Sequence, residues 1–180
     1  MILNFLKRYT FNELIRLFFE DRLFFIFGSL PGYESILLRR YLYRILFKKL
    51  GKNSLFYSGA NFTHAFNISI GDFCSFNAGS YIDGHGFIEI GDYCMIGPNS
   101  FVGSSNHFIK SSLNNPRLFL GHNKNETRIG ANVWIGANVV VCPGVAIGDN
   151  SIVAAGSVVV ENVIESVLVG GNPAKIIKKI

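Results

Sequence analysis

The chain repeats a pattern six residues long from Ile70 onward. A two-residue insertion and one longer segment interrupt it, and otherwise an aliphatic or phenylalanine side chain returns at every sixth position: Ile70, Phe76, Ile82, Ile90, Ile96, Val102, Ile129, Ile135, Val141, Ile147, Val153 and Val159. This period fits neither an α-helix nor the alternation of a simple strand. It predicts a prism whose faces are very short strands, with three hexapeptides in each coil and parallel hydrogen bonding between stacked coils.

Glycine and small residues hold fixed places in the repeat. Glycine follows the aliphatic residue at 71, 91, 97, 103, 130, 136 and 148. We expect these glycines at the corners of the prism, where a positive φ costs glycine little. Cys74 and Cys94 hold the small position four residues after an aliphatic and lie one coil apart. They are therefore expected to stack in the core as inert thiols.

Residues 1–52 read as a helical segment ahead of a β-helical domain at 53–180. Thr10 and Glu13 have the spacing of a capping box before a helical run of apolar residues. A Pro-Gly pair ends that run, and a second helix is predicted over 33–50, where a glycine follows.

A protruding loop is predicted at 103–128. The 27 positions from Val102 to Ile129 exceed four hexapeptides by three, and the segment between them has no repeat. Long loops inside compact repeat domains are usually functional or disordered. Function is favoured here because His107 lies at the base of the loop.

Charge differs between the two parts of the chain. The composition, with 49% hydrophobic and 16% charged residues, excludes a disordered protein. Residues 1–52 hold ten Lys or Arg against four Asp or Glu, and 53–180 hold seven against eight, which makes the net charge +5. The near-neutral body argues against a nucleic-acid partner. The basic segment indicates contact with a membrane surface or another subunit.

Two interpretations of this basic segment stay open. Its apolar side chains pack against the rest of the protein while Arg and Lys lie in solvent, or its helices lie on a membrane interface. The packing interpretation concerns Phe18, Phe24, Phe25, Leu38, Leu42 and Leu46. The start of the chain does not resemble a signal peptide. Three cysteines without a CxxC pair favour a reducing compartment, and the cytoplasm is expected.

The repeat, the loop, the stretch VWIGANVVVCPGVAIGDNSIVAAGSVV and the closing VGGNPAKIIKKI together resemble the hexapeptide-repeat acyltransferases, closest to the galactoside, maltose and polysaccharide O-acetyltransferase branch. The resemblance covers about residues 53–180. It implies a mainly β fold, a left-handed parallel β-helix, assembled as a homotrimer. It also implies that acetyl-CoA, the acyl donor, binds between neighbouring subunits.

The same resemblance implies the catalytic residues. His107 matches the family's histidine, whose neutral imidazole can accept a proton from an acceptor hydroxyl. Asn77 matches an asparagine across the active site that orients the acceptor or donates to the oxyanion; the alternative is an asparagine placed at a corner for its left-handed backbone preference. Either Asp83 or His85 is expected to contact the acceptor. The other two histidines are expected to be structural (His64) and solvated (His122).

The coenzyme is expected along the later coils. By resemblance, Trp134 lies beside the pantetheine arm, and Ala137 and Ala155 approach that arm through their backbones. Lys175 and Lys178, in the C-terminal tail, meet the CoA phosphates as point charges. A Trp packed on the exterior and solvated lysines are the alternatives. No metal is expected, since no His, Cys and Asp residues have ligand spacing.

The sequence thus predicts a cytoplasmic, acetyl-CoA-dependent O-acetyltransferase of a sugar or glycan, in the biosynthesis of a surface polysaccharide such as lipopolysaccharide or capsule. One alternative is N-acetylation of a nucleotide-linked amino sugar, in which His107 deprotonates an amine. The other is a trimeric β-helix scaffold without catalysis, which His107, Trp134 and Lys175 disfavour.

Overall fold

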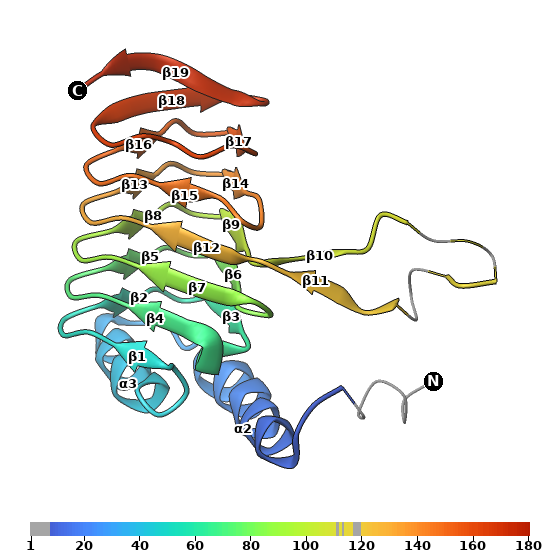
Figure 1. The fold of residues 1–180 in the computed structure, drawn as a ribbon. Helices are drawn as coiled ribbons and strands as arrows, with labels where there is room; N and C mark the ends of the chain where they lie inside the picture. Colours follow the sequence, from blue (N-terminus) through green and yellow to red (C-terminus); the bar gives the residue numbers. More distant parts are fainter. Residues whose placement is uncertain (1–7, 111, 113, 117–119) are drawn as a thin grey trace.

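The computed structural model describes residues 8–110, 112, 114–116 and 120–180, so the start of the 1–52 segment and five residues of the loop lie outside it. Its short strands stack along one axis, with two helices at one end and the chain's last two strands at the other (Figure 1). Between them, an arm of two strands projects sideways from the stack (Figure 1). The molecule is therefore a β-helix with a helical end and a lateral arm.

Three sheets form the faces of the prism. The first contains β1 (Lys49–Leu50), β4 (Ile68–Ile70), β7 (Phe87–Ile90), β12 (Glu126–Ile129) and β15 (Ala146–Ile147). The second contains β2 (Leu55–Phe56), β5 (Ser75–Phe76), β8 (Met95–Ile96), β13 (Trp134–Ile135), β16 (Ile152–Val153), β18 (Val167–Gly171) and β19 (Ala174–Lys179). The third contains β3 (Asn61–Thr63), β6 (Tyr81–Asp83), β9 (Phe101–Gly103), β14 (Val140–Val141) and β17 (Val158–Val159).

The hexapeptide prediction is confirmed. Successive strands fall on successive faces, and equivalent strands of neighbouring coils pair in parallel, as β4 does with β7. All twelve repeated aliphatic or phenylalanine side chains are buried in one continuous core. Cys74 and Cys94 are buried in that core as well, and both are free thiols. Each thiol lies within hydrogen-bond distance of the carbonyl of a glycine in the following coil.

The prediction about glycine conformation is wrong. None of the seven glycines that follow an aliphatic is among the positive-φ residues of the described chain. Most of the described non-glycine residues with positive φ lie two positions after one of these glycines, as Phe73, Asn132 and Asn138 do. The glycines are needed for another reason, the close approach of the coils. A Cβ built on Gly91 would lie 2.7 Å from the backbone nitrogen of Ala131. No side chain fits at that distance.

The helical segment begins as predicted and ends earlier. Helix α2 (Phe11–Phe27) carries the full capping box between Thr10 and Glu13. Helix α3 (Tyr33–Tyr43) stops seven residues before the predicted end. After it, Leu46 and Phe47 turn into the core of the first coil, and the chain continues as β1, paired with β4. The apolar residues expected to extend the helix close the open end of the prism instead.

Two buried ionisable side chains attach the helices to the first coil. Glu20 of α2 is 2% exposed and accepts hydrogen bonds from the backbone N–H groups of His64 (2.6 Å) and Ala65 (2.7 Å). Arg39 of α3 is 1% exposed, and its guanidinium donates to the carbonyls of Phe56, Phe27 and Leu30. Both satisfy backbone groups that burial would otherwise leave unpaired.

The packing interpretation of the helices is only partly right. Phe24, Leu42 and Leu46 pack on the core as expected, but Phe18 (51%), Phe25 (87%) and Leu38 (39%) are exposed. Exposed apolar side chains recur at helical spacing on both helices: Phe11, Ile15, Phe18, Phe25 and Ile26 on α2, and Tyr33, Leu37 and Tyr41 on α3, followed by Ile45. Each helix therefore has an inner and an outer apolar stripe. Among the described helices, none has the length and apolar character needed to cross a bilayer.

Candidate active site

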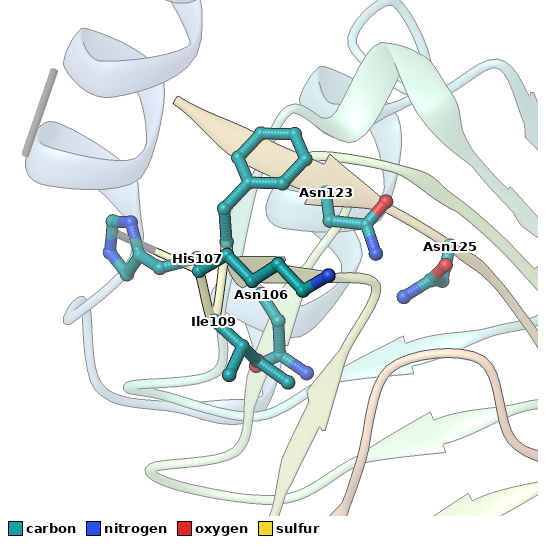
Figure 2. A pocket seen from close by; sticks show the side chains of 7 residues that line it. Asn106, His107, Ile109, Asn123 and Asn125 are labelled. Atoms are coloured by element: carbon teal, nitrogen blue, oxygen red, sulfur yellow. The ribbon is translucent and has the colours of Figure 1, made fainter. Parts of the chain in front are cut away.

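The predicted loop forms an arm that carries His107. Strands β10 (Ser105–His107) and β11 (His122–Lys124) pair antiparallel and place His107 directly opposite His122. One side of the arm borders an open hollow of about 680 Å³, lined by residues 106–110 with Asn123 and Asn125. The His107 ring points away from these two asparagines (Figure 2). The imidazole therefore faces the other side of the arm.

On that side, all four histidines of the chain form a row. Neighbouring ring centroids lie 4.3 Å apart for His64 and His85, 4.3 Å for His85 and His122, and 4.4 Å for His122 and His107. Tyr9 stacks on the far end, with its hydroxyl 3.1 Å from Nε2 of His64. The expectation that His122 is a solvated loop residue is wrong, because its ring lies half-buried between those of His85 and His107.

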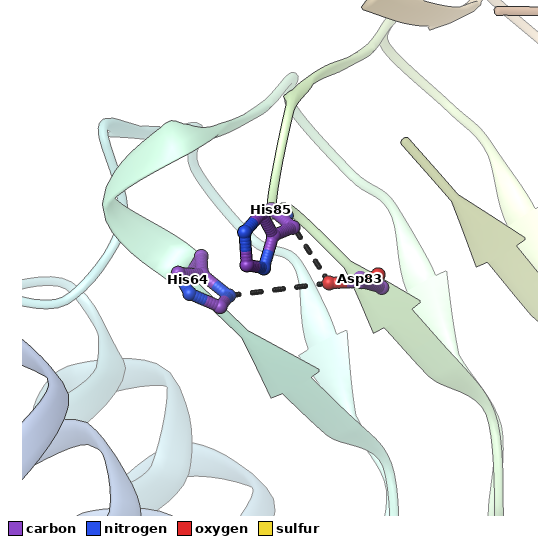
Figure 3. Close-up of side chains that lie close together, drawn as sticks. All are labelled: His64, Asp83 and His85. Atoms are coloured by element: carbon purple, nitrogen blue, oxygen red, sulfur yellow. Dashed lines mark hydrogen bonds and ion pairs between the residues drawn. The ribbon is translucent and has the colours of Figure 1, made fainter. Parts of the chain in front are cut away.

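Asp83 lies beside the buried end of this row. It ends β6, opposite Thr63 of the neighbouring coil, whose hydroxyl donates to Oδ1 at 3.0 Å. The backbone N–H of His85 donates to the same oxygen at 3.1 Å, and the Ser105 hydroxyl lies 3.4 Å from Oδ2. Nδ1 of His64 is 4.0 Å from Oδ1 (Figure 3). The strand ends thus hold this carboxylate next to both imidazoles.

Three of the four imidazoles are held neutral. Burial, reinforced by the neighbouring His64 and His122, lowers the pKa of His85 to about 4. Burial also lowers the pKa of His64 and, together with His107, that of His122. The carboxylate of Asp83 opposes each of these shifts without reversing it. At neutral pH these rings can therefore accept hydrogen bonds or donate a lone pair.

Asn77 lies at a different corner of the prism from the histidines. Its backbone N–H donates to the carbonyl of Ile96 in the next coil, and the N–H of Gly136 donates to the carbonyl of Val153 in the same way. Asn77 and Gly136 therefore hold equivalent positions in their coils. Its side-chain amide also donates to the Ile96 carbonyl, at 3.1 Å. Asn77 has no positive φ, so the left-handed corner alternative is wrong.

The predicted coenzyme residues share the corner or the face of Asn77. Ala137 follows Gly136, and Ala155 follows Ala154, the equivalent residue of the next coil. The N–H of Gly156 donates to the Ala137 carbonyl at 2.8 Å. Trp134 is 49% exposed on the second sheet, between Met95 and Ile152. Lys175 and Lys178 lie exposed on β19 of the same sheet, and Lys175 forms a 3.1 Å ion pair with Glu161.

One chain thus carries two separate sets of candidate residues. Asp83 and His85 lie at the corner that follows the third sheet, and His122 separates them from His107 on the arm. The second set, Asn77, Trp134, Ala137 and Ala155, lies along the second sheet and its corner.

The sequence interpretation missed the contribution of Glu20, which fixes the backbone of His64 beneath the histidine row. A charged residue three positions after Leu17 and four before Phe24, on the inner stripe of α2, was the available signal.

Comparison with known proteins agrees with the fold. The family of bacterial transferase hexapeptide proteins (six repeats) matches residues 126–161. The chain is 33% identical over 145 residues to the galactoside O-acetyltransferase of Escherichia coli (strain K12), an alignment covering 79% of this chain and 68% of that protein. It spans only 26% and 31% of two other curated relatives, from Saccharomyces cerevisiae and Lysinibacillus sphaericus.

Solved structures show the same similarity. A hexapeptide-repeat-containing acetyltransferase of Vibrio cholerae O1 biovar eltor, complexed with acetyl coenzyme A, superposes with a TM-score of 0.82 at 31% identity, over 92% of this chain and 87% of that one. A galactoside acetyltransferase in complex with coenzyme A gives 0.84 at 29% identity, over 95% and 84%. The fold defines a hexapeptide-repeat transferase. The chain belongs to the hexapeptide-repeat acetyltransferases.

Proposed function

We propose that the chain transfers the acetyl group of acetyl-CoA to a hydroxyl group of a sugar or glycan, in the cytoplasm, during biosynthesis of a surface polysaccharide. The position of His107 on the projecting arm, at the outer end of the histidine row that leads through His122 to His85, is the observation that carries this proposal. The named activities and bound coenzymes of the relatives support it. No acyl-enzyme is required.

His107 would act as general base in a direct transfer. Its imidazole accepts the hydroxyl proton while the acceptor oxygen attacks the thioester carbon, a contribution of about 10²–10⁴ in rate. The tetrahedral intermediate then expels the CoA thiolate, which takes the proton from the imidazolium. Asp83 or His85 would bind another group of the acceptor. His122, whose ring contacts that of His107 at a tilt, would hold the base in place.

Asn77 would complete the site from a second subunit. An amide NH₂ has two hydrogens, so the group that donates to Ile96 can also donate to an oxyanion. Because Asn77 and His107 lie at different corners of one chain, a site containing both requires two copies side by side. The resemblance to the trimeric hexapeptide-repeat acyltransferases implies that these copies form a closed trimer, in which the same contact occurs three times. The half-exposed Trp134 would then be covered at the interface, beside the pantetheine arm.

The coenzyme would lie along the corner formed by Ala137 and Ala155. Their small side chains leave the backbone open to the pantetheine arm. Lys175 and Lys178 would meet the phosphates, for which Lys175 must leave its exposed partner Glu161. Exposed ion pairs of this kind are worth only about 0–1 kcal/mol. The phosphates therefore compete easily for that lysine.

A screen of acetyl transfer tests this function. The full chain is incubated with acetyl-CoA and with sugars, nucleotide sugars and lipid-linked glycans, and thiol release and product mass are followed. We expect turnover with a hydroxyl acceptor. Turnover only with amino groups would support N-acetylation instead. Acetyl-CoA that neither binds nor reacts would contradict the proposal.

The outer stripes of α2 and α3 support contact with an anionic membrane surface. Exposed apolar side chains alternate there with Arg22, Arg40 and Arg44, the composition of an interfacial helix. Such a position would bring the helical end of the molecule to lipid-linked acceptors.

We expect the intact protein to float with anionic vesicles at low salt and to dissociate at high salt. Each basic residue near the surface adds about 1 kcal/mol of salt-sensitive attraction. Replacing Phe25 and Tyr41 together by Ser should reduce flotation, since both are exposed and their loss leaves the core intact. Ile164→Ser, a change at an exposed apolar residue of the β-helical body, is the control. Membrane contact would be contradicted if the protein did not float, or if flotation changed neither with salt nor in the Phe25 and Tyr41 double variant.

A further inference from the structure

His64, Asp83 and His85 form a cluster at the ends of two neighbouring strands. His64 follows β3 and Asp83 ends β6, and these strands pair in parallel with Thr63 opposite Asp83. One ligand atom from each of the three residues lies within 4.8 Å of the others. Figure 3 shows both imidazoles beside the Asp83 carboxylate. The rigid coils, rather than the arm, therefore determine the spacing of the cluster.

His64 presents a buried ring nitrogen to this cluster. Nδ1 has no hydrogen-bond partner among the residues that the structure describes, and it lies 4.0 Å from Oδ1 of Asp83, too far for a hydrogen bond. An unpaired buried polar atom of this kind requires an explanation, such as an ion or a water molecule. The other ring nitrogen, Nε2, is 3.1 Å from the Tyr9 hydroxyl. A proton on Nε2 can be donated there, which leaves the Nδ1 lone pair directed at the carboxylate.

We propose that His64, Asp83 and His85 bind a divalent transition-metal ion of the zinc class. Two imidazole nitrogens and one carboxylate oxygen suit Zn²⁺ or Co²⁺ and not Mg²⁺ or Ca²⁺, which prefer oxygen ligands. Ligand bonds of about 2.0–2.2 Å require the three atoms to close by roughly an ångström. Side-chain rotation can supply that shift. Three protein ligands leave a fourth position for the oxygen of water or a hydroxyl group.

The groups around the cluster already orient two of its three ligands, His64 and Asp83, as a metal site requires. Ligating histidines usually donate their second N–H to a fixed partner, and ligating carboxylates are themselves hydrogen-bonded. Here Tyr9 is the partner of His64, and Thr63 and the His85 backbone hold Oδ1 of Asp83. Glu20 fixes the backbone of His64 from below.

Metal titration of the untagged, metal-free full chain tests the site. We expect calorimetry to show one Zn²⁺ bound per chain, unaffected by excess Mg²⁺, and bound Co²⁺ to develop a visible spectrum of mixed nitrogen and oxygen ligation. His85→Asn and Asp83→Asn should each weaken Zn²⁺ binding at least about tenfold. His107→Asn, which removes a histidine two rings away, should leave it unchanged.

Three results would overturn the site. They are the lack of saturable Zn²⁺ binding by the unaltered chain, a Zn²⁺ affinity of both cluster variants equal to that of the unaltered chain, and loss of Zn²⁺ binding in His107→Asn. Circular dichroism verifies that each variant is folded, and the titration of the unaltered chain remains decisive if one is not. Because the titration contains neither acetyl-CoA nor a sugar, its outcome is separate from that of the acetyl-transfer screen.

Discussion

His107→Ala should lower the turnover of acetyl transfer by about 10²–10⁴, the usual contribution of a general base. Affinity for acetyl-CoA should stay near that of the unaltered enzyme, because the imidazole acts on the acceptor proton and does not hold the coenzyme. The measurement is kcat and KM with an acceptor from the screen, together with a direct binding titration of acetyl-CoA. Full turnover by the variant would assign the base elsewhere.

The double variant Lys175→Ala and Lys178→Ala provides the matched contrast. If the two lysines bind the CoA phosphates equally in the ground and transition states, their loss raises the KM for acetyl-CoA and leaves kcat nearly unchanged. An unchanged KM would indicate that both lysines are solvated and do not bind the CoA phosphates. Opposite patterns in the two variants would separate the acceptor side of the site from the coenzyme side.

Arg39→Met should destabilise the protein by about 3 kcal/mol or more. The side chain is almost fully buried and donates to three carbonyls, at 2.8 Å to Phe56, 2.8 Å to Leu30 and 3.2 Å to Phe27. Methionine fills much of the volume but pairs with none of them, and each buried group left unpaired costs about 1–3 kcal/mol. For a chain of this size, that loss lowers the unfolding midpoint by roughly 6–12 °C.

Arg44→Met is the control, because Arg44 lies exposed just after α3. Surface substitutions of this kind change stability by about 0.5 kcal/mol or less. Both variants are measured by thermal unfolding at one protein concentration, since assembly makes the midpoint concentration-dependent. Equal midpoints for the two variants would show that solvent or relaxed backbone satisfies the three carbonyls.

The repeat predicts most of the fold because one inward side chain defines each face of the prism. Every aliphatic position identified in the pattern is buried for this reason. The glycine expectation failed because periodicity shows where a small residue is required and not whether conformation or coil spacing requires it. The end of α3 was missed because Leu46 and Phe47 also continue a helical pattern, and only the open end of the first coil draws them into the core.

The contacts of the site were harder to predict from the sequence than the fold. The reason is different for each contact. His64 and Asp83 meet because they lie one coil apart, and counting a full coil across the two-residue insertion would have predicted that contact. His122 meets His107 only through the pairing of the arm, which follows no repeat. Glu20 and Arg39 are charged residues on inner helix stripes, and no pattern specifies which backbone groups they satisfy.

The open ends of a stack of β-helical coils carry unpaired backbone groups that could pair with strands of another chain. In this molecule both ends of the second sheet are protected against such pairing. At one end the helices cover the first coil, and Arg39 takes the carbonyl of Phe56 on the edge strand β2. At the other end the chain reverses into β19, the only antiparallel strand among the described members of the three sheets. Exposed lysines along that strand discourage further pairing. The two ends of the second sheet are therefore protected against pairing with strands of another chain.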